Sequence, residues 1–261
     1  MPFHQFDSVR YYSFPIFEDE PITQAIFTRQ GGVSGGAWDS LNVGATVGDE
    51  LANVIENRAR SFKAAGRHIQ TMYDSWLIHG TGVLIAETPN PRSYESPPQG
   101  DILLTNNPGV SLFMRFADCV PILFYDAHLR VIGLAHAGWR GTVKGVVTAT
   151  LDAMKAHYGT KSENVLAAIG PAISAEKYEV GAEVAERVER KFGSEARELL
   201  PQINGTTHFD LWKANLLLLE QAGVNKVQVA GICTASHTED WFSHRADQGR
   251  TGRFGALVSL A

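Results

Sequence analysis

The chain has 261 residues, of which 44% are hydrophobic and 20% charged, a composition typical of a globular protein with one large core. Its formal net charge of −5 and its scattered Lys and Arg residues argue against nucleic acid as a partner. The first residues lack the pattern of a signal peptide, and Arg115 and Asp118 interrupt the most apolar stretch. We therefore expect a cytoplasmic protein that does not enter a membrane, either a monomer or a small homo-oligomer.

The first half of the chain predicts a strand, a glycine-rich loop and a helix. Residues 22–29 form a β-rich apolar run, and residues 31–50 are rich in glycine. A helix is predicted over 49–66, with acidic residues at its start and glycine at its end. Leu51, Val54, Ile55, Arg58 and Phe62 are expected near one face of this helix, with Arg58 on its polar edge. The proline-rich segment 88–101 predicts a surface loop near the site, and whether it forms a lid is left open.

The second half predicts an alternation of strands and helices. Three apolar runs are expected to form adjacent central strands, at 109–116, 120–126 and 130–137. Further strands are predicted at 164–171 and 226–233, and helices at 142–159, 182–192 and 210–223. Asp210 is the expected N-cap of the last helix, and Cys233 is expected to be a buried strand cysteine. The mixed order predicts an α/β or α+β architecture, with residues 1–261 in a single domain.

Three residues in apolar or glycine-rich surroundings stand out as a group: His79, Cys119 and His136. Each lies at the edge of a strand-like run, where a fold can fix a side chain and still leave it reachable. Two imidazoles and one thiol can bind zinc and leave one coordination position open, as catalytic zinc sites do. Any one of them alone is explained at least as well by packing or by a structural hydrogen bond. The hypothesis of an enzyme site with these three residues as metal ligands and catalytic residues therefore depends on all three meeting.

The segment after His136 predicts an anion site. Gly138, Trp139, Arg140 and Gly141 lie where a strand passes into a helix, and the free N–H groups and the dipole of a helix start favour an anion. Arg140 adds a planar, permanently charged donor suited to phosphate or carboxylate. We expect the metal ligand and the anion site to be neighbours.

A few other polar residues are candidates on weaker grounds. Arg29, Asn42 and Arg58 are candidate substrate contacts, although polar residues flanked by glycine commonly satisfy turns. His237 and His244 offer a second metal pair, but no carboxylate or cysteine stands at a diagnostic spacing beside them. We interpret these two as surface histidines.

Short motifs spread over nearly the whole chain resemble those of one family. They include TRQGGVSGG, SLNVG, the HG of IHGTGV, ADCVPI, AHAGWRGT, IGPAIS, and FSHR with TGRFGAL. Through the specific combination of ADCVPI and HAGWRG, the chain resembles the YfiH-like family, also called DUF152 or multicopper polyphenol oxidase (laccase-domain) proteins and related to the immune protein FAMIN. The resemblance implies a single-domain α/β sandwich, remotely like bacterial deamidating toxins. It also implies that His79, Cys119 and His136 form a zinc-binding active centre.

The activity that the resemblance implies is purine nucleoside chemistry. It implies phosphorolysis of adenosine, inosine and methylthioadenosine to the free base and a sugar 1-phosphate, with phosphate as co-substrate, and deamination of adenosine. The residues are compatible with both reactions. Phosphate fits the turn at Arg140, and zinc lowers the pKa of bound water to about 7, which suits deamination.

The chain departs from the family pattern at positions outside the three central residues. Leu77 stands where the family usually has Gln, and Thr46 stands where it usually has His. Lys177 lies in a segment where the family typically has cysteines, and His244 replaces the tyrosine of FSYR. Because the three central residues are intact, the resemblance still implies the same class of activity.

Three other functions are consistent with parts of the sequence. Two His and one Cys also resemble an electron-transfer copper centre, as in a copper polyphenol oxidase, although the chain has only nine histidines and no His-x-His pair. A metal-free cysteine hydrolase would use Cys119 as nucleophile and His136 as its base. A binding module without catalysis would be indifferent to replacement of all three residues.

Overall fold

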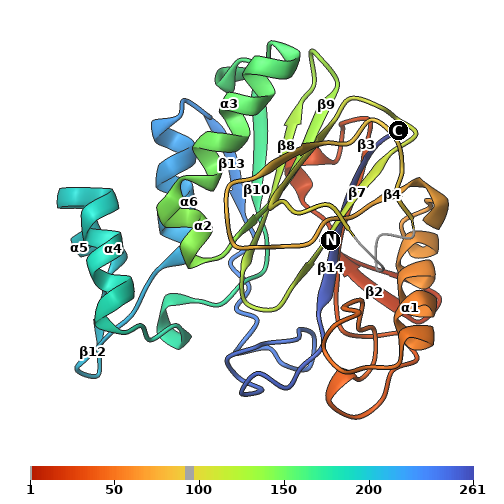
Figure 1. Ribbon diagram of the computed structural model, residues 1–261, viewed down its shortest axis with the longest axis horizontal. Helices are drawn as coiled ribbons and strands as arrows, with labels where there is room; N and C mark the ends of the chain where they lie inside the picture. Colours follow the sequence, from red (N-terminus) through yellow and green to blue (C-terminus); the bar gives the residue numbers. More distant parts are fainter. Residues whose placement is uncertain (1, 92–96) are drawn as a thin grey trace.

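The computed structural model of the protein describes residues 2–91 and 97–261. Two six-stranded sheets stack face to face, and helices cover their outer faces, which gives the four layers visible in Figure 1. This arrangement confirms the predicted mixed α/β class and the layered sandwich.

The two large sheets contain twelve of the strands. The first sheet consists, in spatial order, of β1 (Phe3–Phe6), β2 (Val9–Tyr12), β3 (Ile22–Phe27), β14 (Phe254–Leu260), β7 (Ser111–Phe116) and β4 (Met72–Tyr73). The second consists of β13 (Lys226–Val229), β10 (Val165–Ile169), β8 (Val120–Asp126), β9 (Val131–Ala137), β6 (Ile102–Thr105) and β5 (Val83–Ile85). A separate small sheet pairs β11 (Gln202–Ile203) with β12 (Thr206–Thr207).

The helices lie on the two outer sides of the sandwich. They are α1 (Leu51–Ala64), α2 (Trp139–Lys144), α3 (Val146–Tyr158), α4 (Ala182–Phe192), α5 (Ala196–Leu199) and α6 (Leu211–Gln221). Figure 1 shows α1 against the first sheet and α2, α3 and α6 against the second.

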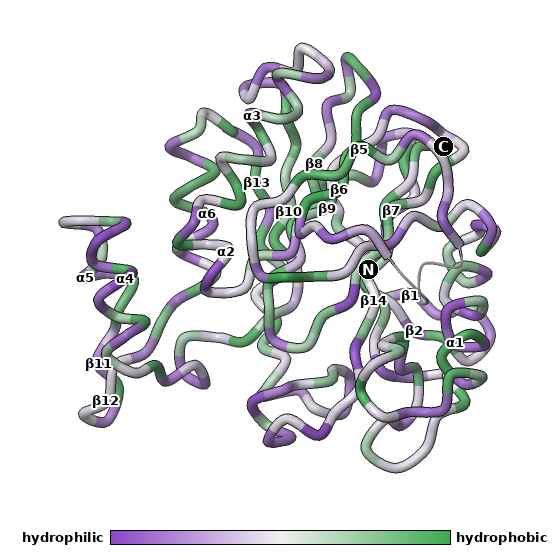
Figure 2. The backbone as a smooth tube through the Cα atoms, in the orientation of Figure 1, coloured by the Kyte–Doolittle hydropathy of each residue, from purple (hydrophilic) through white to green (hydrophobic). Residues whose placement is uncertain are grey.

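Both faces of the second sheet are buried, which explains why its central strands are continuously apolar. Along β8, Ile122 and Phe124 pack toward the helices, whereas Leu123 and Tyr125 pack toward the first sheet. A strand with two buried faces has no need for alternating polar residues. Figure 2 shows hydrophobic residues concentrated along these central strands.

The three runs predicted as adjacent central strands lie in two different sheets. β8 and β9 pair antiparallel, as predicted, but β7 pairs with β14 in the first sheet, so the prediction was wrong for that strand. After β7 the chain crosses from one sheet to the other within 117–119. Hydrophobic pattern cannot indicate which of two stacked sheets a buried strand joins.

The helix predicted over 49–66 forms as α1, and it buries Val54, Arg58 and Phe62 of the predicted face but not the other two residues. Leu51 and Ile55 were predicted to be buried and are 45% and 43% exposed. The buried side instead includes Asn57, whose amide donates to the carbonyl oxygen of Asn42, 2.8 Å away. The helix therefore holds the glycine-rich loop through polar contacts that an apolar pattern does not indicate.

The helix predicted over 142–159 is two helices. Gly145 between α2 and α3 has φ 86°, a left-handed conformation that ends a helix and favours glycine. The later helix over 210–223 is confirmed as α6, and Asp210 caps it by accepting from the backbone N–H of Lys213 at 2.9 Å.

Both cysteines are free. Cys233 is buried as predicted, but it lies beyond the end of β13, where its sulfur accepts from the N–H of Ser174. Residues 92–96 of the predicted 88–101 loop lie outside the described residues, so its role as a lid stays a prediction. No helix in the described part of the chain is long and apolar enough to cross a bilayer.

Candidate metal centre and its pocket

The fold brings His79, Cys119 and His136 together. Cys119 lies where the chain crosses between the sheets, His136 lies on β9, and His79 follows β4 in a loop. One ligand atom from each residue can be chosen so that all three lie within 4.8 Å of one another. The imidazole rings of His79 and His136 are 4.9 Å apart and nearly perpendicular. The three residues therefore meet, as the hypothesis of a metal site requires, and their roles as ligands and catalytic residues stay predictions.

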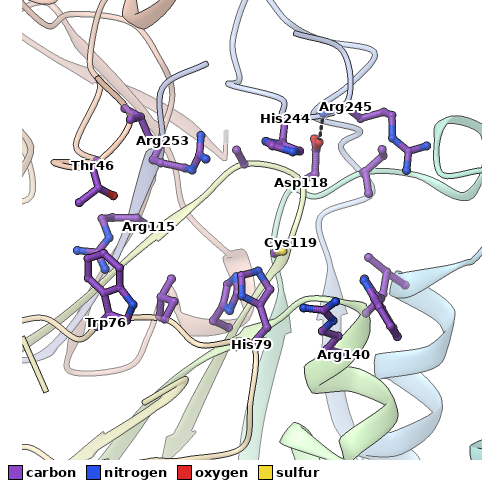
Figure 3. Close-up of a pocket in the computed structure, with 18 of the residues that line it drawn as sticks. Thr46, Trp76, His79, Arg115, Asp118, Cys119, Arg140, His244, Arg245 and Arg253 are labelled. Atoms are coloured by element: carbon purple, nitrogen blue, oxygen red, sulfur yellow. Dashed lines mark hydrogen bonds between the residues drawn. The ribbon is translucent and has the colours of Figure 1, made fainter. Parts of the chain in front are cut away.

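Two residues of this cluster region adopt positive φ without being glycine. His79 has φ 58° and Asp118, directly before Cys119, has φ 80°. Such conformations are uncommon and persist where the surroundings hold them, often at functional sites. The carboxylate of Asp118 accepts from the hydroxyl of Thr234 at 2.7 Å and from the N–H of Arg245 at 2.7 Å, the bond drawn in Figure 3.

Asp101 organises the cluster from behind, and the sequence analysis missed it. Its fully buried carboxylate accepts from the N–H groups of Ile78, His79 and Gly80, at 2.8 to 3.2 Å. It also lies 2.9 Å from Nδ1 of His136. Because an ionised carboxylate only accepts hydrogen bonds, Nδ1 carries a proton toward Asp101, and Nε2 is the nitrogen that can bind a metal once its own proton has left. The available signal was a lone acidic residue at the start of an apolar run, QGDILL.

The cluster is an ion pair at neutral pH. Burial alone would raise the pKa of the Cys119 thiol, but the charge and hydrogen bond of His136, together with His79, outweigh burial and lower it to about 6. Burial alone would lower the pKa of His136, but the charge of Cys119 and the hydrogen bond to Asp101 raise it to about 9. Between these values Cys119 is a thiolate and His136 an imidazolium.

These residues fit a zinc ion. Two imidazole nitrogens and a thiolate are donors that zinc prefers, and three protein ligands leave one position for substrate or water. Gly138 keeps the space around the donors open, since a Cβ there would lie 2.8 Å from Sγ of Cys119 and 3.2 Å from Cδ2 of His79. Within residues 2–91 and 97–261 this is the one group of three or more His, Cys, Asp or Glu residues arranged for a metal.

The cluster lies in the wall of a cavity of about 630 Å³, a size that holds a small organic ligand. Figure 3 shows the side chains around it. Besides the three donors, its wall contains four arginines and several apolar or aromatic residues, namely Arg115, Arg140, Arg245, Arg253, Trp76, Leu77, Trp139, Ile173, Tyr178 and Leu211. Four arginines against one lining carboxylate, that of Asp118, leave the cavity cationic. A cationic cavity with an aromatic wall suits an anion and a planar ring together.

Of the predicted substrate contacts, Arg140 alone lines this cavity. Arg29 instead donates to the carbonyl oxygens of Asp39 and Thr238 and stacks on Phe242. It therefore ties the glycine-rich loop to the C-terminal segment rather than facing a substrate.

Asn42 and Arg58 are buried behind the cavity wall. Oδ1 of Asn42 accepts from the N–H groups of Gly44 and Arg253, both of which line the cavity. Arg58 forms an ion pair with the buried Asp74, 3.2 Å away. Both residues support the wall, and their contacts explain why polar residues stand at buried positions.

The departures from the family pattern lie around the cavity. Thr46, Leu77 and His244 line it, and Lys177 directly precedes the lining residue Tyr178. His244 was interpreted as a surface histidine; it is exposed and also faces the cavity, while His237 pairs with the exposed Glu239.

Residues 23–261 match the family described as multi-copper polyphenol oxidoreductase laccase. The chain is 40% identical over 239 residues to a protein of Deinococcus radiodurans named purine nucleoside phosphorylase, which covers 92% of this chain and 89% of that protein. It is 32% identical over 249 residues to purine nucleoside phosphorylase YlmD of Bacillus subtilis, covering 93% of this chain and 90% of that protein.

Solved structures resemble the whole sandwich. The hypothetical protein YfiH of Bacillus licheniformis superposes with a TM-score of 0.92 at 28% identity, covering 100% of this chain and 99% of that one. YlmD from Geobacillus stearothermophilus gives a TM-score of 0.92 at 30% identity, covering 99% and 98%. With a match over nearly its whole length, the chain belongs to the multi-copper polyphenol oxidoreductase laccase family, in which the YfiH-like resemblance of its motifs is confirmed.

Proposed function

We propose that the protein is a zinc-dependent purine nucleoside phosphorylase with His79, Cys119 and His136 as metal ligands and reaction centre. The observation that carries the proposal is the meeting of two imidazoles and a thiol, within 4.8 Å, in the wall of a cationic cavity. Relatives over nine-tenths of the chain are named purine nucleoside phosphorylase, which supports the same activity.

Phosphorolysis exchanges one bond at the ribose C1′ for another. A phosphate oxygen forms a bond to C1′ while the bond from C1′ to purine N9 breaks, and the purine takes up a proton. When bound, zinc supplies a Lewis acid that stabilises charge developing in the transition state. The chain itself holds the donors rigidly through Asp101, orients phosphate with arginines, and places the nucleoside against an apolar wall.

We extend the proposal to adenosine, inosine and methylthioadenosine as substrates, and to deamination of adenosine. Ile173, Tyr178 and Leu211 give the cavity an apolar and aromatic wall, which suits a purine ring. In deamination, water supplies the oxygen that replaces the 6-amino group, and ammonia leaves.

The test is a product assay with the zinc-loaded protein. Given adenosine and phosphate, it is expected to release adenine and ribose 1-phosphate, and given adenosine alone, inosine and ammonia. Cys119→Ala removes one donor and is expected to abolish phosphorolysis, whereas Cys233→Ala, which alters the other free cysteine, retains it. Full activity of a correctly folded Cys119→Ala protein would reject the assignment.

Two other functions are tested with the same preparations. A copper polyphenol oxidase predicts bound copper and oxidation of phenols, although one group of donors in the described chain offers one metal position and a multicopper cluster needs several. A metal-free cysteine hydrolase is favoured by the thiolate and imidazolium pair of Cys119 and His136. It predicts activity that survives a chelator and a trapped covalent intermediate on Cys119.

A further inference from the structure

Arg115 and Arg253 reach the cavity from neighbouring strands. Arg115 lies on β7, where the pairing register sets it opposite Gly255 of β14, and Arg253 directly precedes β14. Figure 3 shows both on the side of the cavity that carries Thr46 and Trp76, whereas Arg140 and Arg245 lie on the opposite side. The cavity therefore has two cationic sides with the metal donors between them.

The guanidinium of Arg115 is fixed from behind. It donates to the buried carboxylate of Asp74 at 2.6 Å and to the carbonyl oxygen of Ser75, and its side chain is only 12% exposed. Asp74 is shared, since the same oxygen lies 3.2 Å from Arg58. The bonds to Asp74 and Ser75 therefore hold the guanidinium of Arg115 in one place in the cavity wall.

Arg253 is fixed by backbone groups and carries an unbalanced charge. Its Nη1 donates to the carbonyl oxygens of Thr251 and Gly252, at 3.0 and 2.8 Å. Among the described residues no carboxylate lies within ion-pair distance of it. The charges of Cys119 and then Asp118 act on it from farther away, and the carboxylate of Asp118 is already engaged by Thr234 and Arg245. Burial lowers the pKa of Arg253, as expected for a cation that lacks a close counter-charge.

The glycine-rich loop sets the position of Arg253. Oδ1 of Asn42 accepts from its backbone N–H at 2.8 Å. Gly44 leaves room for its side chain, because a Cβ at Gly44 would lie 2.8 Å from Cγ of Arg253. The motif SLNVG, whose Asn42 was predicted to contact substrate, therefore acts through Arg253.

The two arginines on the opposite side are engaged differently. Arg140 lies 5.2 Å from the ring of Trp139, and Arg245 lies 5.0 Å from the ring of Tyr178 and donates to backbone carbonyls. Arg140 lies in the short helix α2 and Arg245 lies in a loop, and both are exposed. Guanidiniums stacked on aromatic rings at the surface are suited to flanking a base or ribose more than to enclosing a dianion.

We propose that Arg115 and Arg253 form the binding site for inorganic phosphate, with Asp74 and Asn42 as the residues that position them. Two fixed guanidiniums supply several N–H donors to a tetrahedral anion whose oxygen attacks C1′. The purine then lies toward Ile173, Tyr178 and Leu211, and the ribose lies between, beside the metal donors. As a statement about the nucleophile, the inference rests on the proposed function.

The experiment compares phosphate binding in matched variants of the zinc-loaded protein. Calorimetric titration with inorganic phosphate is combined with the KM for phosphate at saturating nucleoside. Arg253→Gln and Arg115→Gln are expected to weaken phosphate binding about 10- to 100-fold, as for loss of charge-assisted hydrogen bonds, while the KM for nucleoside stays within about threefold. Arg253→Lys, which keeps the charge, is expected to lose less. Arg250→Gln removes an equal charge from the exposed neighbouring loop and is expected to bind phosphate like the unaltered protein.

The outcomes separate this inference from the proposed function. Unaltered phosphate affinity in Arg253→Gln and Arg115→Gln, with melting temperatures showing that they fold, overturns the inference even if phosphorolysis is present. A loss seen in Arg140→Gln instead moves the anion to the other side and also overturns it. Weakened binding of adenosine 5′-monophosphate with unaltered binding of free phosphate assigns the arginines to a substrate phosphate and overturns it as well. Phosphate binding that depends on Arg253, in a protein without phosphorolysis, upholds the anion site and rejects the proposed function.

Discussion

We call His79, Cys119 and His136, with Asp101 behind them, the floor of the cavity. The loop residues Thr46, Trp76, Leu77 and His244 form its rim. On the floor, His136 lies on a strand that pairs along its whole length, and the fully buried Asp101 fixes its ring. On the rim, Trp76 is 42% exposed and His244 is also exposed, and both lie outside regular secondary structure. The floor therefore keeps its geometry through the fold, whereas the rim keeps its position through individual loop contacts.

The departures from the family pattern follow the same division. The three residues expected to depart from it, Thr46, Leu77 and His244, line the cavity, whereas the three candidate metal donors match the motifs on which the resemblance rests. Reactions need donors that are held within a fraction of an ångström. His136 is held by its strand, and the loop residue His79 is held by the bond from its N–H to the buried Asp101. Loops tolerate substitution and so allow the choice of ligand to change. We infer that the floor determines the chemistry and the rim determines which ligand is accepted.

The largest expected effect is the response of the floor to pH. In the metal-free protein the pKa of Cys119 is lowered to about 6 and that of His136 is raised to about 9. Between these values Cys119 is already a thiolate, so a metal displaces one proton, from His136; below pH 6 the thiol proton must leave as well. Because each displaced proton changes affinity about tenfold per pH unit, the protons of Cys119 and His136 are expected to make zinc affinity fall as the pH decreases, about tenfold per unit from pH 9 to pH 6 and about 100-fold per unit below pH 6.

Competition with a zinc indicator between pH 5 and 8 measures this change in slope. Cys119→Ser is the control, since it is expected to lose the steeper part of the curve. A pH titration of thiolate absorbance in the metal-free protein measures the pKa of Cys119 independently. A titration of Cys119 near the ordinary thiol value of about 8.5 would contradict the ion pair.

A smaller effect is expected from filling the space beside the donors. Gly138→Ala adds a Cβ 2.8 Å from Sγ of Cys119, at a residue whose φ of −73° accepts alanine without backbone strain. We expect zinc affinity to fall about 10- to 100-fold, the range for overpacking a rigid site. Calorimetric titration with zinc measures it.

Gly181→Ala is the matched control for this change. Gly181 precedes α4 with nearly the same backbone angles, φ −80° and ψ 172°, and no atom lies within 4 Å of the added Cβ. Both variants lose a glycine from a helix N-cap, so both carry the same capping cost. Equal zinc affinities in the two variants would show that the space at Gly138 has no role in the metal site.

The sequence was sufficient to predict the three candidate metal donors of the floor, but not Asp101, the residue that holds two of them in place. His79, Cys119 and His136 each lie at the edge of an apolar run, and this placement was sufficient to group them. Asp101 was missed because a single acidic residue before a strand is also a common solvent-exposed position. Its contact with His136 joins residues 35 positions apart, and only the pairing of β6 with β9 brings them together.

The rim and the layering were the less predictable parts. Arg115 was noticed only as an interruption of an apolar stretch, because its orientation depends on β7 joining the first sheet. The buried face of α1 was predicted only in part, because Asn57 is buried through hydrogen bonds to a loop, and an apolar pattern counts such a residue as exposed. Both failures come from polar residues that become buried only through tertiary contacts.

The smallest expected effect comes from the rim. His244→Tyr introduces the residue expected from the motif resemblance at a position that lines the cavity, while the loop stays held by the bond from the N–H of Arg245 to Asp118. We expect the KM for nucleoside to change by less than about tenfold, as for one exposed contact, with zinc affinity unchanged. Steady-state kinetics with adenosine and inosine, together with zinc titration, measure both. A fall in zinc affinity as large as that of Gly138→Ala would show that floor and rim are not independent, because a loop side chain would then control the metal donors.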